Sequence, residues 1–255
     1  MTTAMSDQRG IVWEIVPDAE ALAQRAASWL LAAARAQDGA FAIALSGGAT
    51  PRRLYEVLAE PPYRDVFPWP RVHLFWGDER FVPRDDAASN YRMVHEALLS
   101  RVSIPDANIH AIPTEGLHPD DAAAAYEREL KSFYGADRLD PARPLFDVVL
   151  LGLGSDGHTA SLFAGSAILD ERDRWVAAVL DAKSEPRITL TYPALESSRR
   201  TAFLVAGSEK REILARFRAG DDALPAARLR PVGTLLVFAD AAAAQNDPHD
   251  DSVAR

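Results

Sequence analysis

The sequence contains no cysteine, and this absence removes several classes of protein at once. No disulfide framework, thiolate zinc site or cysteine nucleophile can be built from it. No apolar run approaches the ~18 residues of a membrane-spanning helix, and residues 1–10 lack the apolar core of a secretory signal. Basic residues are also in deficit, because 28 Lys and Arg stand against 37 Asp and Glu. The resulting net charge of -9 disfavours nucleic acid and anionic membranes as partners, so we expect a cytoplasmic protein that acts on a small molecule.

What the sequence does contain is a repeated alternation of short apolar runs with amphipathic or alanine-rich segments. Expected strands cover residues 11–16, 41–45, 72–76, 109–112, 146–151, 175–180, 187–191, 201–206 and 234–238. Expected helices cover residues 19–37, 51–59, 90–101, 120–134, 209–217 and 241–245. This alternation predicts a mostly parallel, doubly wound, Rossmann-like α/β sheet flanked by helices, with some antiparallel pairing toward the C-terminus. A single domain is expected over residues 11–245, with residues 1–10 and 246–255 as flexible termini.

The stretch 145–163 carries the strongest indication of chemistry. An apolar strand is followed at once by a glycine-rich polar turn that contains Asp156 and His158. Ligands bind at the carboxyl ends of strands in open α/β sheets, so both side chains are expected at a ligand site. Histidine is suited to proton transfer near neutral pH, and a carboxylate two residues away could orient it. A short helix is expected to continue from residues 161–163.

A second glycine-rich turn, Ser46-Gly47-Gly48, lies between an apolar strand and a helix expected to be capped by Thr50. Free backbone N–H groups at such a helix start can bind an anion, although a plain turn of small residues has the same pattern. Lys210 is expected in the first turn of another helix, where its charge opposes the helix dipole. Either a bound anion or a neighbouring carboxylate would compensate it. The charged run 78–80 alone is typical of a solvated loop.

Other catalytic patterns are weaker. Gly152, Gly154 and Gly157 match the dinucleotide fingerprint G-x-G-x-x-G, but Asp156 would bring a negative charge close to the pyrophosphate. No G-x-S-x-G nucleophile elbow occurs, which disfavours a serine hydrolase. Asp156 and His158 could ligate a metal, but no third ligand stands at a diagnostic spacing. General-base chemistry on a small phosphorylated substrate fits the residues better.

Several segments together resemble one family. They are ALSGGATP at 44–51, FWGDERFVP at 75–83, SNY at 89–91, GLGSDGHTASLF at 152–163, RITLTYPAL at 187–195 and GSEK at 207–210. In this order they resemble the 6-phosphogluconolactonases, within the glucosamine-6-phosphate isomerase/deaminase-like superfamily. The deaminase branch typically has Ile-Ala-Phe-Asn-Glu after its Asp-Gly-His, whereas Thr-Ala-Ser-Leu-Phe follows here. Where lactonases commonly have Phe-Pro-Gly, this chain has Phe163-Ala164-Gly165.

The resemblance implies hydrolysis of 6-phospho-D-glucono-1,5-lactone to 6-phosphogluconate in the oxidative pentose phosphate pathway. His158 would be the general base that activates water, and Asp156 would orient His158 or hold the water. The implied phosphate site consists of Ser46, Gly47, Gly48, Arg80, Arg187 and Lys210. No cofactor and no metal are implied, and a monomer is expected. The alternatives are a glucosamine-6-phosphate deaminase and a sugar-phosphate binding protein without catalytic activity.

Overall fold

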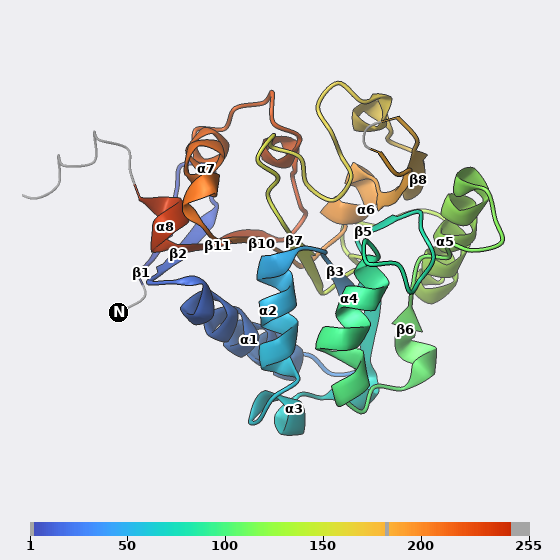
Figure 1. The fold of residues 1–255 in the computed structure, drawn as a ribbon, viewed down its shortest axis with the longest axis horizontal. Helices are drawn as coiled ribbons and strands as arrows, with labels where there is room; N and C mark the ends of the chain where they lie inside the picture. The colour runs from blue at the N-terminus through green and yellow to red at the C-terminus, as the bar shows by residue number, and fades with distance from the viewer. Residues whose placement is uncertain (1–2, 182–183, 246–255) are drawn as a thin grey trace, which may run out of the picture.

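The computed structural model describes residues 3–181 and 184–245, which form a sheet with helices on both faces (Figure 1). The strands are β1 (Thr3–Ser6), β2 (Val12–Val16), β3 (Phe41–Leu45), β4 (Val72–Trp76), β5 (Asp78–Arg80), β6 (Ile109–His110), β7 (Val148–Leu151), β8 (Val176–Val179), β9 (Arg187–Leu190), β10 (Arg200–Val205) and β11 (Thr234–Asp240). The helices are α1 (Ala19–Arg35), α2 (Ala49–Leu58), α3 (Tyr63–Val66), α4 (Asn90–Ala97), α5 (Pro119–Tyr134), α6 (Tyr192–Glu196), α7 (Arg211–Arg218) and α8 (Ala241–Ala244).

The large sheet has the strand order β1-β2-β11-β10-β7-β3-β4-β6, and every pairing except β1 with β2 is parallel. Its central strands are buried on both faces because helices cover both: α1 and α2 lie on one side, α7 and α8 on the other (Figure 1). The predicted mostly parallel, doubly wound sheet is therefore confirmed.

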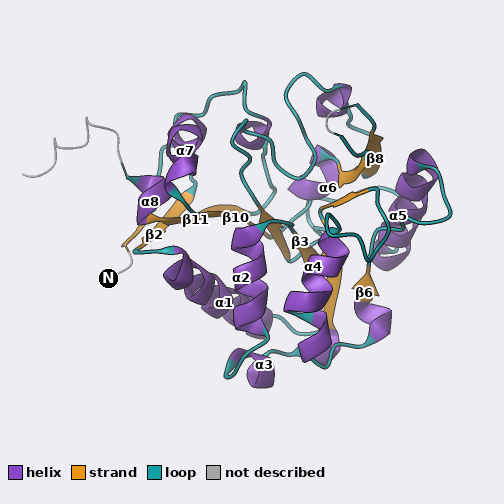
Figure 2. Ribbon diagram, viewed as in Figure 1, coloured by secondary structure: helices purple, strands orange, loops and turns teal. Residues whose placement is uncertain are grey.

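Antiparallel pairing forms a separate three-stranded sheet with the order β5-β9-β8. Its strand β8 packs beside α5 (Figure 2). The antiparallel pairing expected toward the C-terminus thus involves the predicted strands 175–180 and 187–191, whereas the last two strands, β10 and β11, are parallel.

The sheet positions two of the predicted site loops side by side. β3 and β7 are neighbours at its centre; from β3 the chain continues to β4 and β6 on one side, and from β7 to β10 and β11 on the other. The strand order reverses between β3 and β7, and ligands of open α/β sheets bind at such a reversal, outside the carboxyl ends of the strands. Residues 46–48 follow β3 and residues 152–158 follow β7, so both turns lie at this point.

Several local expectations were wrong. Residues 3–6, expected to be part of a flexible terminus, form β1, which pairs with β2 and makes it an internal strand. The run 78–80, read alone as a solvated loop, is strand β5, because it pairs with β9. Gly48 rather than Thr50 caps α2. Residues 161–163 form no helix, because Ala160 has a φ of 47° and a turn closes between Leu162 and Thr159. Residues 246–255, expected to be flexible, lie outside the described residues.

None of the helices in the described ranges combines the length and apolarity that crossing a bilayer requires.

Candidate active site

A cleft of about 460 Å³ opens at the carboxyl ends of the four neighbouring strands β10, β7, β3 and β4. Seven of the eight residues predicted for the site line it: Ser46, Gly47, Gly48, Arg80, His158, Arg187 and Lys210. Asp156 does not line the cleft, but its carboxylate contacts the ring of His158. Segments separated by up to 164 positions in the sequence, from residue 46 to residue 210, therefore contribute to one cavity.

His158 is held at the wall of the cleft by its own turn. Its Nδ1 atom contacts Asp156 Oδ1, and its ring packs against Phe163 with 4.7 Å between centroids. A carboxylate at Nδ1 favours the tautomer in which that nitrogen carries the proton, which leaves Nε2 as a proton acceptor. The ring is 29% exposed, so substrate and water can reach it.

Glycine is required beside this ring. A Cβ atom at Gly154 would lie 2.0 Å from His158 Nδ1, so any other residue there would displace the ring. The turn is closed by two backbone bonds, from Gly154 N to His158 O at 2.9 Å and from Gly157 N to Gly154 O at 2.9 Å. Gly154 and Gly157, two of the three glycines that match a dinucleotide fingerprint in sequence, therefore hold the histidine in place.

The Ser46-Gly47-Gly48 turn is fixed from two helices. The hydroxyl of the fully buried Tyr55 in α2 accepts from Ser46 N at 3.0 Å and donates to Ser46 O at 2.9 Å. Asn90, the first residue of α4, packs so closely on Gly47 that a Cβ there would lie 2.0 Å from Asn90 Oδ1. The turn leads directly into α2, whose first N–H groups have no partner within the helix. This arrangement suits an anion.

Arg80 and Arg187 are direct partners across the antiparallel pair β5–β9. Like charges in this position repel each other, and the Nε atom of each is buried without a hydrogen-bond partner in the described part of the chain. Burial and the charge of Arg80 lower the pKa of Arg187, although an arginine stays protonated in a protein. A bound anion between them would supply the missing acceptor for both.

Lys210 approaches the cleft from the short turn Ser208–Lys210 that follows β10. The buried carboxylate of Asp240 anchors this turn, because both of its oxygens accept from Gly207 N at 3.1 Å. Glu209, the neighbour of Lys210, lines the same cleft, but among the described residues no carboxylate forms an ion pair with Lys210; the lysine ion pair found there is that of Lys131 with Glu127. Of the two explanations for a lysine at this position, the missing ion pair favours a bound anion.

Sequence reasoning assigned no role to several other residues of the cleft. Asp78 lines it and is 8% exposed, with Oδ2 accepting from Ser161 Oγ at 2.7 Å. Asn90 lines it too and donates from Nδ2 to Asp78 O at 2.9 Å. Both belong to segments that carry the family resemblance, FWGDERFVP and SNY. Their burial depends on the pairing of β5 with β9, which local sequence does not reveal.

Glu79 supports this wall from behind. It is 2% exposed and accepts hydrogen bonds from the backbone N–H groups of Arg80, Asn90 and Tyr91, each at 2.7 Å. It therefore fixes the start of α4 to strand β5. Burial raises its pKa to about 6, since the three hydrogen bonds offset the desolvation only in part.

We expect Glu79 to make stability depend on pH. Because its pKa is higher in the folded than in the unfolded chain, its favourable contribution is complete below pH 4.5 and is lost as the pH rises through 6. The free energy of unfolding should fall by about 2 kcal/mol from this group between pH 4.5 and 7.5, at about 1.4 kcal/mol per pKa unit. Urea unfolding of the wild type and of Glu79→Gln across this range measures it. A difference between the two proteins that is constant with pH would contradict the assignment.

Comparison with known proteins shows which family and which solved structures the chain is similar to. Residues 17–237 match the family model described as glucosamine-6-phosphate isomerases/6-phosphogluconolactonase. The chain is 44% identical over 237 residues to the 6-phosphogluconolactonase of Nostoc sp., covering 90% of this chain and 95% of that protein. The crystal structure of 6-phosphogluconolactonase from Thermotoga maritima is 33% identical, with a TM-score of 0.76 over 89% of this chain and 98% of that one. A monomeric glucosamine-6-phosphate deaminase, 19% identical with a TM-score of 0.77 over 91% of this chain and 98% of that one, shares the fold.

Proposed function

The chain belongs to the glucosamine-6-phosphate isomerase/6-phosphogluconolactonase family, and we infer that it hydrolyses 6-phospho-D-glucono-1,5-lactone to 6-phosphogluconate. This is a step of the oxidative pentose phosphate pathway. One observation carries the assignment. The same cleft is lined by His158, whose Nδ1 contacts a carboxylate, and by the three cationic side chains Arg80, Arg187 and Lys210.

In the proposed reaction, His158 Nε2 accepts a proton from a water molecule as the water oxygen attacks C1 of the lactone. The C1 carbonyl becomes a tetrahedral oxyanion. Its collapse breaks the bond between C1 and the ring oxygen, which takes the proton back from His158 and leaves as a hydroxyl group. A positioned general base of this kind accelerates a reaction by about 10²–10⁴-fold. The lactone is already an activated ester, so the proposal requires no cofactor.

The phosphate of the substrate would lie on the Ser46-Gly47-Gly48 turn and the start of α2, between Arg187 and Lys210. The unpartnered Nε atoms of Arg80 and Arg187 support this placement. Guanidinium groups bind phosphate through two parallel hydrogen bonds, which fixes its orientation as well as its position. The far end of the sugar would then be directed toward His158.

Two assays separate this function from its alternatives. Hydrolysis of freshly prepared lactone, followed as acid release, should be fast, and ammonia release from glucosamine 6-phosphate should be absent. Ammonia release without lactone hydrolysis would make the protein a deaminase. Binding of both sugar phosphates without turnover would make it a binding protein. A monomeric state and a cytoplasmic location are further parts of the proposal, tested by light scattering and by cell fractionation.

We expect Asp156→Asn to lower kcat by roughly 10- to 100-fold with little change in KM, because an asparagine amide can donate to His158 Nδ1 and thereby place the proton on Nε2. Steady-state kinetics on the lactone measures both constants. Asp173→Asn, which removes another exposed carboxylate outside the cleft, is the matched control and should behave as wild type. Wild-type kcat in Asp156→Asn would show that the carboxylate does not set the tautomer of the base.

A further inference from the structure

The segment from Leu224 to Ala227, in the connection between α7 and β11, lies directly behind the turn that carries His158. Ala226 N donates to Gly157 O at 3.1 Å. The buried side chain of Leu224 packs on Gly157 so closely that a Cβ there would lie 2.6 Å from Leu224 Cδ2. Gly157 has a φ of 82° and immediately precedes His158, so a shift of this segment would be transmitted to the catalytic ring.

One side chain outside the connection holds this segment in place. Tyr192 is 2% exposed, and its hydroxyl donates to Pro225 O at 2.7 Å. Burial raises the pKa of Tyr192 to about 12, so the hydroxyl remains a donor at any pH at which the enzyme works. Tyr192 begins α6, two positions after the end of β9, the strand that starts with Arg187. The hydrogen bond therefore connects the phosphate-binding strand to the support of the histidine turn.

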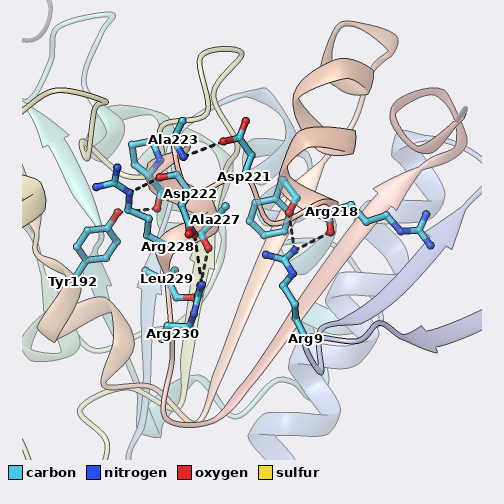
Figure 3. A network of polar contacts seen from close by, with 12 residues as sticks. Arg9, Tyr192, Arg218, Asp221, Asp222, Ala223, Ala227, Arg228, Leu229 and Arg230 are labelled. Carbon is cyan, nitrogen blue, oxygen red and sulfur yellow. Dashed lines mark hydrogen bonds and ion pairs between the residues drawn. The ribbon is translucent and has the colours of Figure 1, made fainter.

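The connection is also held by Glu196, at the end of α6, whose Oε1 accepts from Arg230 N at 2.8 Å and whose backbone O accepts from Val232 N at 2.9 Å. Further bonds lie within the connection itself. Arg228 Nε donates to Asp222 O at 2.5 Å, and Arg230 Nη1 donates to Ala227 O at 2.6 Å and to Leu229 O at 2.9 Å. Figure 3 shows these bonds, with the Tyr192 ring beside Arg228. Glu196 therefore holds the connection to α6 at residues 230–232, and the hydroxyl of Tyr192 holds it at Pro225, next to the residue that bonds the histidine turn.

We propose that Tyr192 is a positioning residue for catalysis: through Pro225, Ala226 and Gly157 its hydroxyl fixes the distance between His158 and C1 of the substrate. The inference rests on the proposed role of His158 as general base. A displacement of a catalytic group by about 1 Å can cost up to roughly 10²-fold in rate, so a small relaxation of the support is measurable. KM should not change together with kcat, because other residues are proposed to bind the phosphate of the substrate.

The experiment compares Tyr192→Phe with Tyr134→Phe. Tyr134 is also buried, and its hydroxyl donates to Arg143 O at 2.7 Å and accepts from Asp140 N at 2.8 Å, but neither partner belongs to the segment 224–227 or to the His158 turn. Tyr192→Phe loses one hydrogen bond and Tyr134→Phe loses two, so both should lower Tm and the control should lower it at least as much. At a temperature where both are folded, Tyr192→Phe should lower kcat roughly tenfold with KM within about twofold of wild type, while Tyr134→Phe keeps wild-type kcat.

A second pair of variants tests the same support without touching Tyr192. Leu224→Ala removes the packing behind Gly157 and should lower kcat, and Leu224→Met, which keeps the volume, should restore most of it. Wild-type kcat in Tyr192→Phe, an equal loss in Tyr134→Phe, or a change confined to KM would overturn the proposal. These experiments also separate this inference from the proposed function. Wild-type activity in His158→Ala would show that His158 is not the general base. An inactive His158→Ala together with a fully active Tyr192→Phe would contradict only the positioning role of Tyr192.

Discussion

Replacing His158 with alanine is expected to lower kcat by about 10²–10⁴-fold and to leave KM nearly unchanged, because in the proposed reaction the ring acts on the attacking water and not on the phosphate. The ring is 29% exposed and lies in a turn that is closed by backbone bonds, so its removal should not unfold the protein. Initial rates on fresh lactone across a range of concentrations give kcat and KM separately, and circular dichroism verifies the fold.

The matched control is His118→Ala. His118 is exposed, precedes α5 and does not line the cleft, so its loss should change neither constant. If His158→Ala retained more than about a tenth of the wild-type kcat, proton transfer to this ring would contribute less than a general base is known to supply. The catalytic assignment would then have to move to another group of the cleft, such as the buried carboxylate of Asp78.

Replacing Arg187 with alanine is expected to raise KM by roughly 10- to 100-fold, since a hydrogen bond to a charged group contributes about 1.5–3 kcal/mol and 1.4 kcal/mol corresponds to tenfold. The effect on kcat should be smaller, although a looser phosphate also orients the sugar less well. Inhibition by inorganic phosphate should weaken in parallel. Lys210→Ala should show the same pattern.

Stability provides a second readout for Arg187. It lies opposite Arg80 with its Nε unpartnered, and its ion pair with Glu185, at 3.6 Å, joins it to an exposed carboxylate and contributes little. Its removal should therefore relieve repulsion and leave Tm unchanged or raised. A purely structural arginine would lower Tm when removed. Arg174→Ala is the control, since Arg174 is 42% exposed, lies outside the cleft and is 3.6 Å from Glu127. Equal changes in kcat for the arginine and histidine variants would contradict separate binding and catalytic groups.

The parts of the site that the sequence predicted are those encoded locally. The turns around Ser46 and His158 each follow an apolar strand, and glycine patterns mark where the chain reverses. Their convergence followed from a general property of parallel sheets, whose strand ends meet at one edge. The inclusion of Arg80 and Arg187 in the site, and the assignment of individual roles, required the family resemblance.

The parts that sequence could not predict depend on distant pairings. Three consecutive charged residues, as at 78–80, are typical of a solvent-exposed loop. Their burial results from pairing with β9, more than 100 positions later in the sequence. The four-residue segment 3–6, which has no pattern typical of a strand, becomes one by pairing with the edge of β2. The hydrogen bond of Tyr192 joins residues 33 positions apart, one at the start of the short helix α6 and one in the connection between α7 and β11, and no local pattern in the sequence indicates such a contact.

A crystal structure with bound 6-phosphogluconate tests the central claim most directly. We expect the phosphate to contact the N–H groups of Gly47 and Gly48 together with Arg187 and Lys210, and the C1 carboxylate to lie about 2.6–3.2 Å from His158 Nε2. A product bound in the reverse direction, with its phosphate beside His158 and its carboxylate between Arg80 and Arg187, would contradict the account.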